Sequence, residues 1–273
     1  MEHFIEIIKS IILGIVEGIT EWLPISSTGH MILVNDFMGI TEDSFFNSQL
    51  FLYVIQLGAI LAVATMFFHK LNPLSPSKSA DEKRSTLEMW LKVIIACLPA
   101  AVIGLALNDF MDSISTPLMV SAMLIVYGIA FILVERLGKE VKYNSVNELT
   151  YKTAFLIGMF QVLSIIPGTS RSGATILGAM LLGCSRGIAA EFSFFLAIPV
   201  MFGVSFLKIV TNDTPMDAFR RILLIVAMVT AYGVSLATLK GLMNYVKKHS
   251  FTAFGIYRII LGAIVIIFTL FKM

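Results

Sequence analysis

Charged residues and cysteines are both scarce in this chain of 273 residues. Charged side chains make up 14% of it, and 20 basic residues nearly balance 18 acidic ones, so no segment resembles a tail that binds nucleic acid or another polyanion. The two cysteines, Cys97 and Cys184, both lie in apolar stretches, which argues against a disulfide framework and against a thiolate metal centre. Long polar connections are missing too, so we expect no separate soluble domain.

Apolar residues, by contrast, are abundant: 57% of the chain is hydrophobic and the mean hydropathy is +0.87. This composition excludes a soluble domain, because a folded domain of this length needs a largely polar exterior. The sequence therefore predicts an all-α, polytopic membrane protein that forms a single integral membrane domain over residues 1–273. Six apolar runs of about 20 residues are long enough to cross a bilayer, and they cover residues 46–68, 88–108, 117–135, 187–208, 220–240 and 251–271.

Two further apolar regions are unsuited to simple transmembrane helices. Region 4–40 contains ionisable side chains and is broken at Pro24, and region 151–185 contains Arg171 and is broken at Pro167. Each half is short, and an ionised group at bilayer depth costs roughly 2.5–3.5 kcal/mol on the insertion scale. We therefore expect two re-entrant helix pairs, each entering and leaving by one face. Two ordinary transmembrane helices with kinks remain the alternative.

The two broken regions also resemble each other. Gly14–Glu17 precedes Pro24–Gly29 in the first region, and Gly158–Gln161 precedes Pro167–Gly173 in the second. Three full transmembrane helices follow each region. A re-entrant pair does not change side whereas three crossings do, so the second copy is inverted relative to the first. Interrupted helices at matching positions of two inverted halves predict a site where the halves meet.

The predicted topology divides the chain into repeat 1, about residues 1–137, and repeat 2, about residues 150–273. Lysine and arginine then concentrate in the loops on one side, which makes that side cytoplasmic. Both termini lie outside, the first helix pair dips in from outside, and the second rises from the cytoplasm. We call the turn of each helix pair its tip: residues 17–30 form the first tip and residues 167–175 the second. We expect the two tips to meet near mid-membrane and the active site to open toward the extracytoplasmic face.

The first tip carries two glutamates on one helix face. Glu17 and Glu21 are four residues apart, so both carboxylates project from the same side of a helix. In a low dielectric they would repel each other unless a cation lies between them. A hard divalent ion, Mg²⁺ or Ca²⁺, suits carboxylate oxygens together with water and phosphate. The alternative is a structural pair that bonds to the backbone or to Arg171.

Hydroxyl residues follow Pro24 and can start a helix. Ser26 or Ser27 is the expected N-cap, and Ser26 and Thr28 are candidate substrate-binding residues beside the helix N-terminus, which favours anions. Ser27 and His30 are three residues apart, so the histidine can hold or deprotonate the serine hydroxyl. In the alternative interpretation the serines only cap the helix and His30 makes a local hydrogen bond.

The second tip surrounds one arginine with small and hydroxyl residues at another expected helix N-terminus. Arg171 offers a planar fork of donors that matches phosphate oxygens. The segment lacks the Gly-Lys-Ser/Thr ending of a Walker A loop. In the alternative interpretation Arg171 only neutralises a glutamate. Separately, Glu191 and Arg258 in the later helices are expected to form a structural ion pair. The candidate substrate-binding residues of this tip are Gly168, Thr169, Ser170, Ser172, Gly173 and Thr175.

Together, Glu17–His30 (EGITEWLPISSTGH) and Pro167–Thr175 (PGTSRSGAT) closely resemble the undecaprenyl-pyrophosphate phosphatases of the bacitracin-resistance type. The resemblance covers the whole chain. It implies an inverted-repeat enzyme of the bacterial plasma membrane that hydrolyses undecaprenyl diphosphate to the monophosphate and recycles the lipid carrier of cell-wall synthesis. It also implies roles for the tip residues: Glu17 and Glu21 serve the divalent ion, Ser27 and His30 the attack, and Arg171 the phosphate.

Two other functions compete with this one. A secondary transporter also has inverted repeats and broken helices at mid-membrane. A second class of membrane phosphatase places a catalytic histidine after a Ser-Arg pair, but here the next histidine after Arg171 is His249. The expected partners are a polyprenyl diphosphate lipid and the bilayer, without nucleic acid. A homodimer and the identity of the nucleophile, Ser27 or water, are left open.

Overall fold

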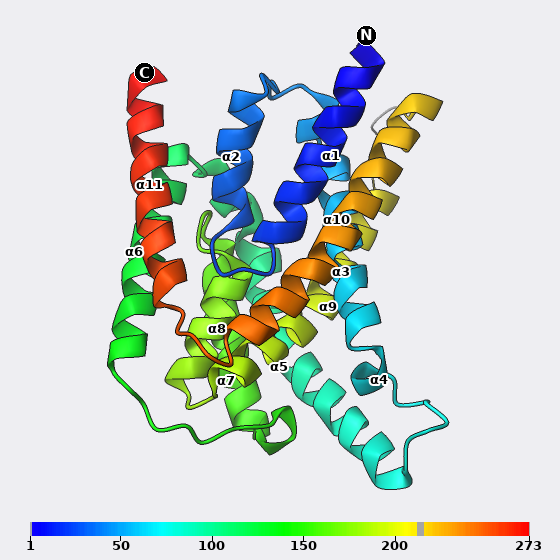
Figure 1. Ribbon diagram of the computed structural model, residues 1–273, viewed down its shortest axis with the longest axis vertical. Coiled ribbons are helices and arrows are strands. Elements are labelled where there is room, and N and C mark those ends of the chain that lie inside the picture. Colours follow the sequence, from blue (N-terminus) through cyan, green and yellow to red (C-terminus); the bar gives the residue numbers. More distant parts are fainter. Residues whose placement is uncertain (1, 212–215, 273) are drawn as a thin grey trace.

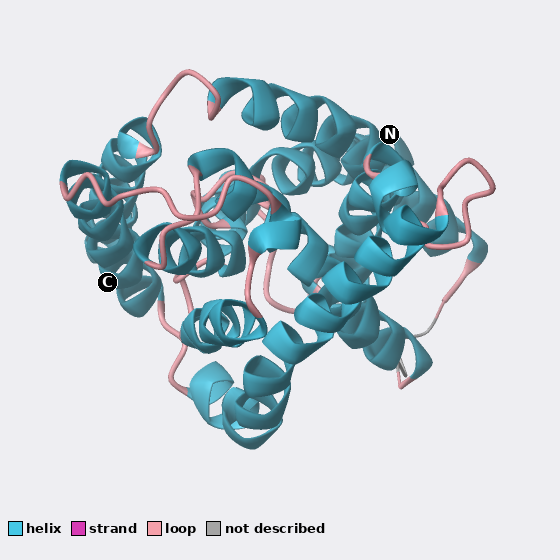
Figure 2. Ribbon diagram, turned by 90° about the horizontal axis from the view of Figure 1, so that it is seen from below, coloured by secondary structure: helices cyan, strands magenta, loops and turns pink. Residues whose placement is uncertain are grey.

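The computed structural model describes residues 2–211 and 216–272, and it contains no β-strand within them (Figures 1 and 2). Six helices are long and apolar enough to cross a membrane, which confirms the predicted all-α, multi-pass architecture. These helices are α3 (Gln49–Met66), α5 (Ala80–Ser113), α6 (Pro117–Arg136), α9 (Arg186–Val210), α10 (Ala218–Tyr245) and α11 (Thr252–Lys272). Short helical pieces outside the broken regions are η1 (Phe45–Asn47), α4 (Phe68–Leu71) and η2 (Val146–Glu148), and η3 (Leu163–Ile165) lies within the second region.

Shorter helices form the two broken regions. The first region contains α1 (Glu2–Thr20) and α2 (Ser27–Phe37), and the second contains α7 (Tyr151–Val162) and α8 (Arg171–Leu181). Figure 1 shows α1 descending from the N-terminus to mid-height and α2 returning toward the same end, with α7 and α8 in the lower half. The structure therefore places a chain reversal at each proline break. Re-entrant placement in a bilayer and the inversion of the repeats stay predictions.

The helices that follow the two reversals are built alike. Ser26 caps α2 with φ +74° and Ser170 caps α8 with φ +68°, a left-handed conformation that few non-glycine residues adopt. Each serine hydroxyl accepts a hydrogen bond from a glycine N–H three residues on, Gly29 at 3.4 Å and Gly173 at 3.2 Å. The matching sequence motifs therefore produce matching helix starts.

Helix packing is equally similar around the two regions. Helix α1 packs along α10, and α7 packs along α5. A glycine permits the close approach in each case, since a Cβ atom at Gly14 would lie 2.6 Å from the Ala227 carbonyl oxygen and one at Gly158 would lie 2.1 Å from that of Ala96. Small residues serve the same purpose where membrane helices pack closely. The two broken regions are thus held against long helices by equivalent contacts.

Aromatic packing fixes the first tip against α9. The Trp22 side chain is fully buried, and its ring packs edge-on to that of Phe194 with 5.5 Å between the ring centroids. Phe195, the next residue of α9, packs edge-on to Phe67 at 5.3 Å. Around this core the long helices expose many large apolar side chains, as expected for surfaces that face lipid rather than water. The tip that carries the two glutamates therefore rests on a rigid aromatic support.

Candidate active site

Glu21 is the central residue of the first tip. Its N–H group bonds to the Glu17 carbonyl at 3.0 Å, so the helical geometry continues beyond α1 and puts both carboxylates on one face, as predicted. Glu21 Oε1 accepts a hydrogen bond from Arg171 Nη2 at 3.0 Å, and Oε2 accepts one from Ser27 Oγ at 3.2 Å. The Glu17 side chain is 2% exposed, and its Oε1 has no hydrogen-bond partner among the described residues.

Arg171 joins the second tip to the first. It is the first residue of α8, and besides its ion pair with Glu21 it donates from Nη1 to the Ser193 carbonyl at 2.9 Å. Its guanidinium lies 5.9 Å from the centre of the Trp22 ring, and its buried Nε has no partner among the described residues. The two tips therefore meet, and the arginine does neutralise a glutamate while it keeps a donor free.

The hydroxyl residues of the second tip divide into two groups. Ser172 Oγ donates to the Glu21 carbonyl at 3.1 Å and so adds a second link between the tips. Thr175 Oγ1 lies 2.6 Å from Ser193 Oγ, and Ser170 Oγ lies 3.2 Å from Ser172 Oγ. These hydroxyls hold the tip together, whereas Thr28 at the start of α2 is exposed.

The two glycines of the second tip serve its backbone geometry. Gly168 has φ +89°, and a Cβ atom there would lie 2.6 Å from the Val120 Cα atom. A Cβ atom at Gly173 would lie 3.1 Å from Arg258 Nη1. Gly168 thus needs glycine for its backbone and its packing, whereas at Gly173 a side chain would press on Arg258.

His30 makes the local hydrogen bond of the alternative interpretation, and it also binds a residue of α11 that the sequence did not indicate. Its Nδ1 lies 2.7 Å from the Ser26 carbonyl and its Nε2 lies 2.7 Å from the Tyr257 hydroxyl. Because a carbonyl only accepts, Nδ1 carries the proton and Nε2 accepts from Tyr257. The Ser27 hydroxyl donates to Glu21 instead, so in this structure the carboxylate is the base next to the serine. The i, i+3 spacing allowed a Ser27–His30 contact, but the carbonyl four residues before the histidine binds its ring.

The expected ion pair between Glu191 and Arg258 is wrong. Glu191 pairs with Lys70 of α4, whose Nζ lies 2.8 Å from Oε1. Arg258 of α11 is completely buried and donates to backbone carbonyls at the tips, Pro24 at 3.2 Å and Gly168 at 3.1 Å. Each side chain has a nearer partner that tertiary packing supplies, and nothing in the local sequence indicates it.

The carboxylates of the first tip suit a divalent cation only in part. Among residues 2–211 and 216–272, no three His, Cys, Asp or Glu side chains gather as a preformed metal centre. Glu17 Oε1 is buried without a partner, while both oxygens of Glu21 are hydrogen-bonded within the protein. Oxygen ligands of this kind suit Mg²⁺ or Ca²⁺ when water and phosphate complete the coordination. The residues therefore fit an ion only if ligands from outside the protein complete its coordination.

The sequence model of the family described as Bacitracin resistance protein BacA matches residues 10–264, a range that includes both tips. The chain belongs to this family. A relative named undecaprenyl-diphosphatase from Enterococcus faecalis is 55% identical, and the match covers 98% of this chain and 99% of the relative. Relatives of the same name from Streptococcus thermophilus and Lactococcus lactis are 53% and 50% identical, covering 100% and 98% of this chain and 96% and 98% of the relatives. These matches confirm the predicted resemblance over the whole chain.

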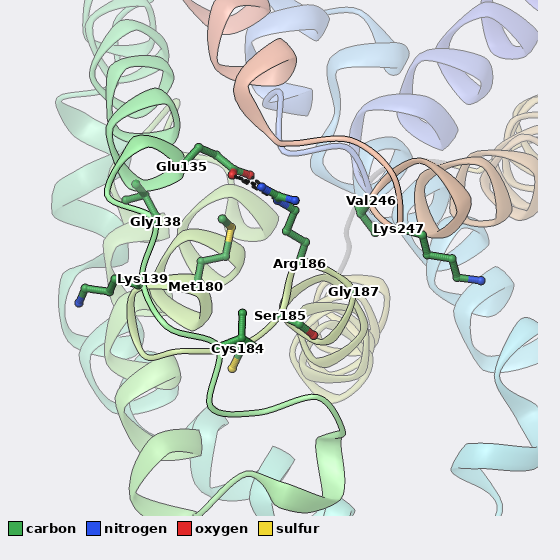
Figure 3. Close-up of a pocket in the computed structure, with 12 residues that line it drawn as sticks. Glu135, Gly138, Lys139, Met180, Cys184, Ser185, Arg186, Gly187, Val246 and Lys247 are labelled. Carbon is green, nitrogen blue, oxygen red and sulfur yellow. Dashed lines mark hydrogen bonds and ion pairs between the residues drawn. The ribbon is translucent and has the colours of Figure 1, made fainter.

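This BacA family member also has a cavity of about 450 Å³ away from the tips (Figure 3). The Glu135–Arg186 ion pair, with 2.7 Å between Oε2 and Nη2, crosses it, and Glu135 also accepts from the Phe251 N–H at 2.7 Å. Lys139 and Lys247 also line the cavity, but Figure 3 shows their ammonium groups pointing outward. None of the tip residues lines this cavity, so its ion pair joins α6 to the start of α9 and serves the fold.

Sequence reasoning missed two residues that contact the candidate site, Tyr257 beside His30 and Ser193 beside Arg171. Both lie within long apolar helices, where a single polar residue has no motif around it. The signal that could have found them is positional, since each lies on a helix that packs against a tip. Arg258 gave a stronger signal, because an arginine inside an apolar helix marks a functional position by default.

Proposed function

We propose that this protein is an undecaprenyl-diphosphatase, which hydrolyses undecaprenyl diphosphate to undecaprenyl phosphate and inorganic phosphate. It thereby recycles the lipid carrier of peptidoglycan synthesis, and bacitracin resistance is a consequence. The observation that carries this proposal is the hydrogen-bonded chain Arg171–Glu21–Ser27, which connects the two tips in a protein whose full length matches relatives of that name.

The terminal phosphate is proposed to bind between the two tips. Arg171 has a free Nε donor, and it can exchange its bond to Glu21 for bonds to phosphate oxygens. Helices α2 and α8 both start at this point, so their first N–H groups and positive dipole ends favour the same anion. Preorganised donors of this kind stabilise the charge that develops on a transferred phosphoryl group.

Ser27 is the proposed nucleophile in one of two routes. Glu21 takes the Ser27 proton as Oγ bonds to the terminal phosphorus, and the bond from that phosphorus to the bridging oxygen breaks, which releases undecaprenyl phosphate. Water then cleaves the phosphoserine, releases phosphate and restores the hydroxyl. In the second route water attacks the terminal phosphorus directly. The hydrogen bond between Ser27 and Glu21 favours the covalent route.

A divalent cation, Mg²⁺ or Ca²⁺, is proposed to bind at Glu17 and Glu21. The support is the buried Glu17 Oε1 without a partner, together with the preference of such ions for carboxylate and phosphate oxygens. When bound there, the ion supplies positive charge against the diphosphate. Glu17 would hold the ion, and Glu21 would contribute beside it while it keeps its contacts with Arg171 and Ser27.

The protein is a multi-pass membrane protein, and we propose that it lies in the bacterial plasma membrane with its active site open to the extracytoplasmic face. The concentration of lysine and arginine in one set of loops supports this orientation. A homodimer stays a prediction, which the mass of the protein in detergent micelles tests.

Phosphate release from undecaprenyl diphosphate by the purified protein in detergent tests the proposed activity. Detergent micelles maintain no gradient, so a transporter would release nothing, whereas a phosphatase turns over. We expect steady release by the wild-type protein. If folded protein releases no phosphate with Mg²⁺ or Ca²⁺ present, the phosphatase proposal fails. The transporter, which broken helices also fit, would then be favoured.

A further inference from the structure

Arg258 makes an unusual set of contacts in the middle of the protein. Its side chain is completely buried, and Nη1 donates to the Pro24 carbonyl at 3.2 Å. Nη2 lies 3.1 Å from the carbonyl oxygens of both Gly168 and Thr169. Nε lies 3.4 Å from that of Leu124 on α6. One side chain of α11 therefore binds the backbone of the first tip, of the second tip and of the helix beside them.

Arg258 contacts backbone carbonyl groups and not carboxylates. Arg258 is in none of the ion pairs within residues 2–211 and 216–272, and its guanidinium is 5.4 Å from the centre of the Tyr127 ring. A buried cation without an anion is costly, and carbonyl oxygens compensate it only where their geometry is good. Such a group inside an apolar helix points to a function beyond stability.

The bound carbonyls lie next to the strained serines of the two tips. Pro24 precedes Ser26 by two residues and Thr169 directly precedes Ser170, and both serines have positive φ. A non-glycine residue keeps this conformation only when its surroundings enforce it. By holding the Pro24 carbonyl two residues before Ser26 and the Thr169 carbonyl directly before Ser170, Arg258 fixes the backbone from which α2 and α8 start.

We propose that Arg258 is the positioning residue that sets the two helix N-termini against one phosphate. The inference rests on the proposed phosphatase function and adds to it that α11, which contributes no residue of either motif, orients both tips at once. Arg258 acts through the backbone: its donors bind carbonyls, and the N–H groups of α2 and α8 bind the substrate. Loss of the Arg258 contacts loosens the backbone of both tips together. The side chains of Arg171, Glu21 and Ser27 all remain present.

The test compares Arg258→Gln and Arg258→Lys with Arg186→Gln as a matched control. Arg186 also bridges elements through its guanidinium, but it pairs with Glu135 away from the tips (Figure 3). We expect Arg258→Gln to lower kcat about 100-fold, since displacements near 1 Å can have that effect. The KM for undecaprenyl diphosphate should change much less. Lysine keeps the charge and some donors, so Arg258→Lys should recover part of the loss, and the control should keep the wild-type kcat.

Hydrogen–deuterium exchange gives a readout that does not depend on activity. In Arg258→Gln, amides of residues 25–31 and of residues 168–175 should both exchange faster than in the wild type, whereas Arg186→Gln should leave them unchanged. If kcat per folded molecule stays at the wild-type value, or only one tip loosens, the proposal is overturned.

If the wild type itself releases no phosphate, the phosphatase assignment fails, and the exchange of the two tips still decides whether Arg258 holds them. Should the glutamine variant not fold, Arg258→Lys alone decides, because lysine lacks the planar fork that reaches the carbonyls of both tips, so amides of both tips must still exchange faster than in the wild type.

Discussion

Arg171 Nη2 lies 3.0 Å from Glu21 Oε1, and this ion pair joins residues 150 positions apart. Both side chains are only about one-tenth exposed, so the pair is shielded from water. The second oxygen of Glu21 binds the Ser27 hydroxyl, which places a cation, a base and a candidate nucleophile in one contiguous chain. Removing either partner of such a buried pair leaves the other uncompensated. Each tip is therefore complete only when the other is present.

Ser27 should carry the phosphoryl group during turnover. We expect undecaprenyl diphosphate labelled on its terminal phosphate to leave label on Ser27, trapped by rapid quenching, and Ser27→Ala to abolish both label and turnover. Ser164→Ala is a suitable control, since that hydroxyl only bonds to the Gln161 carbonyl. Repeated absence of label in variants with slow turnover would instead favour direct attack by water.

Glu21 should matter more as a base than His30. The carboxylate accepts from Ser27, whereas both ring nitrogens of the histidine are bonded elsewhere. We expect Glu21→Gln to lower kcat about 10²- to 10⁴-fold, the usual contribution of a general base. His30→Gln should lower it less, because the histidine supports Ser26 and does not bind the nucleophile. If His30→Gln lowers kcat more than Glu21→Gln does, His30 and not Glu21 is the base.

Removal of divalent ions should stop phosphate release. We expect excess chelator to abolish turnover and added Mg²⁺ or Ca²⁺ to restore it. The carboxylates of the first tip and the diphosphate are all negative, so a cation between them is needed to offset their repulsion. Glu17→Gln should raise the ion concentration required for half-maximal activity, since it removes the negative charge of a carboxylate whose Oε1 has no partner among the described residues. Release that continues unchanged in chelator would keep the enzyme and remove the metal from the site.

Gly168→Ala should loosen the second tip. Its φ of +89° is strained for alanine, and the new Cβ atom would lie 2.6 Å from Val120. We expect a loss of at least about 1 kcal/mol in stability from the backbone strain alone, seen as a lower melting temperature in detergent, together with reduced turnover. Gly187→Ala is the matched control, since a Cβ atom there meets nothing within 4 Å. Equal melting temperatures for the two variants would contradict this account of Gly168.

Hydropathy and proline breaks predict the six long helices and both tips, because long apolar runs and interruptions are local properties of the sequence. The meeting of Glu21 with Arg171 was also foreseen as one of two alternatives, since two opposite charges in apolar regions favour each other. The local bond of His30 to Ser26 was one of two alternatives, but its Tyr257 partner and the partners of Glu191 and Arg258 were missed. Their bonds to Tyr257, to Lys70 and to backbone carbonyls depend on which helix faces are in contact, and spacing along the chain does not contain that information.

A double-mutant cycle between Glu21 and Arg171 tests most directly whether the two tips form one site. The values of kcat/KM for undecaprenyl diphosphate are measured in detergent for the wild type, Glu21→Gln, Arg171→Ala and the double variant. If the two residues act as a unit, each single variant loses most of the activity and the double variant loses little more than the worse of the two. Losses that multiply in the double variant, or substantial turnover in a well-folded Arg171→Ala, would contradict a shared catalytic site.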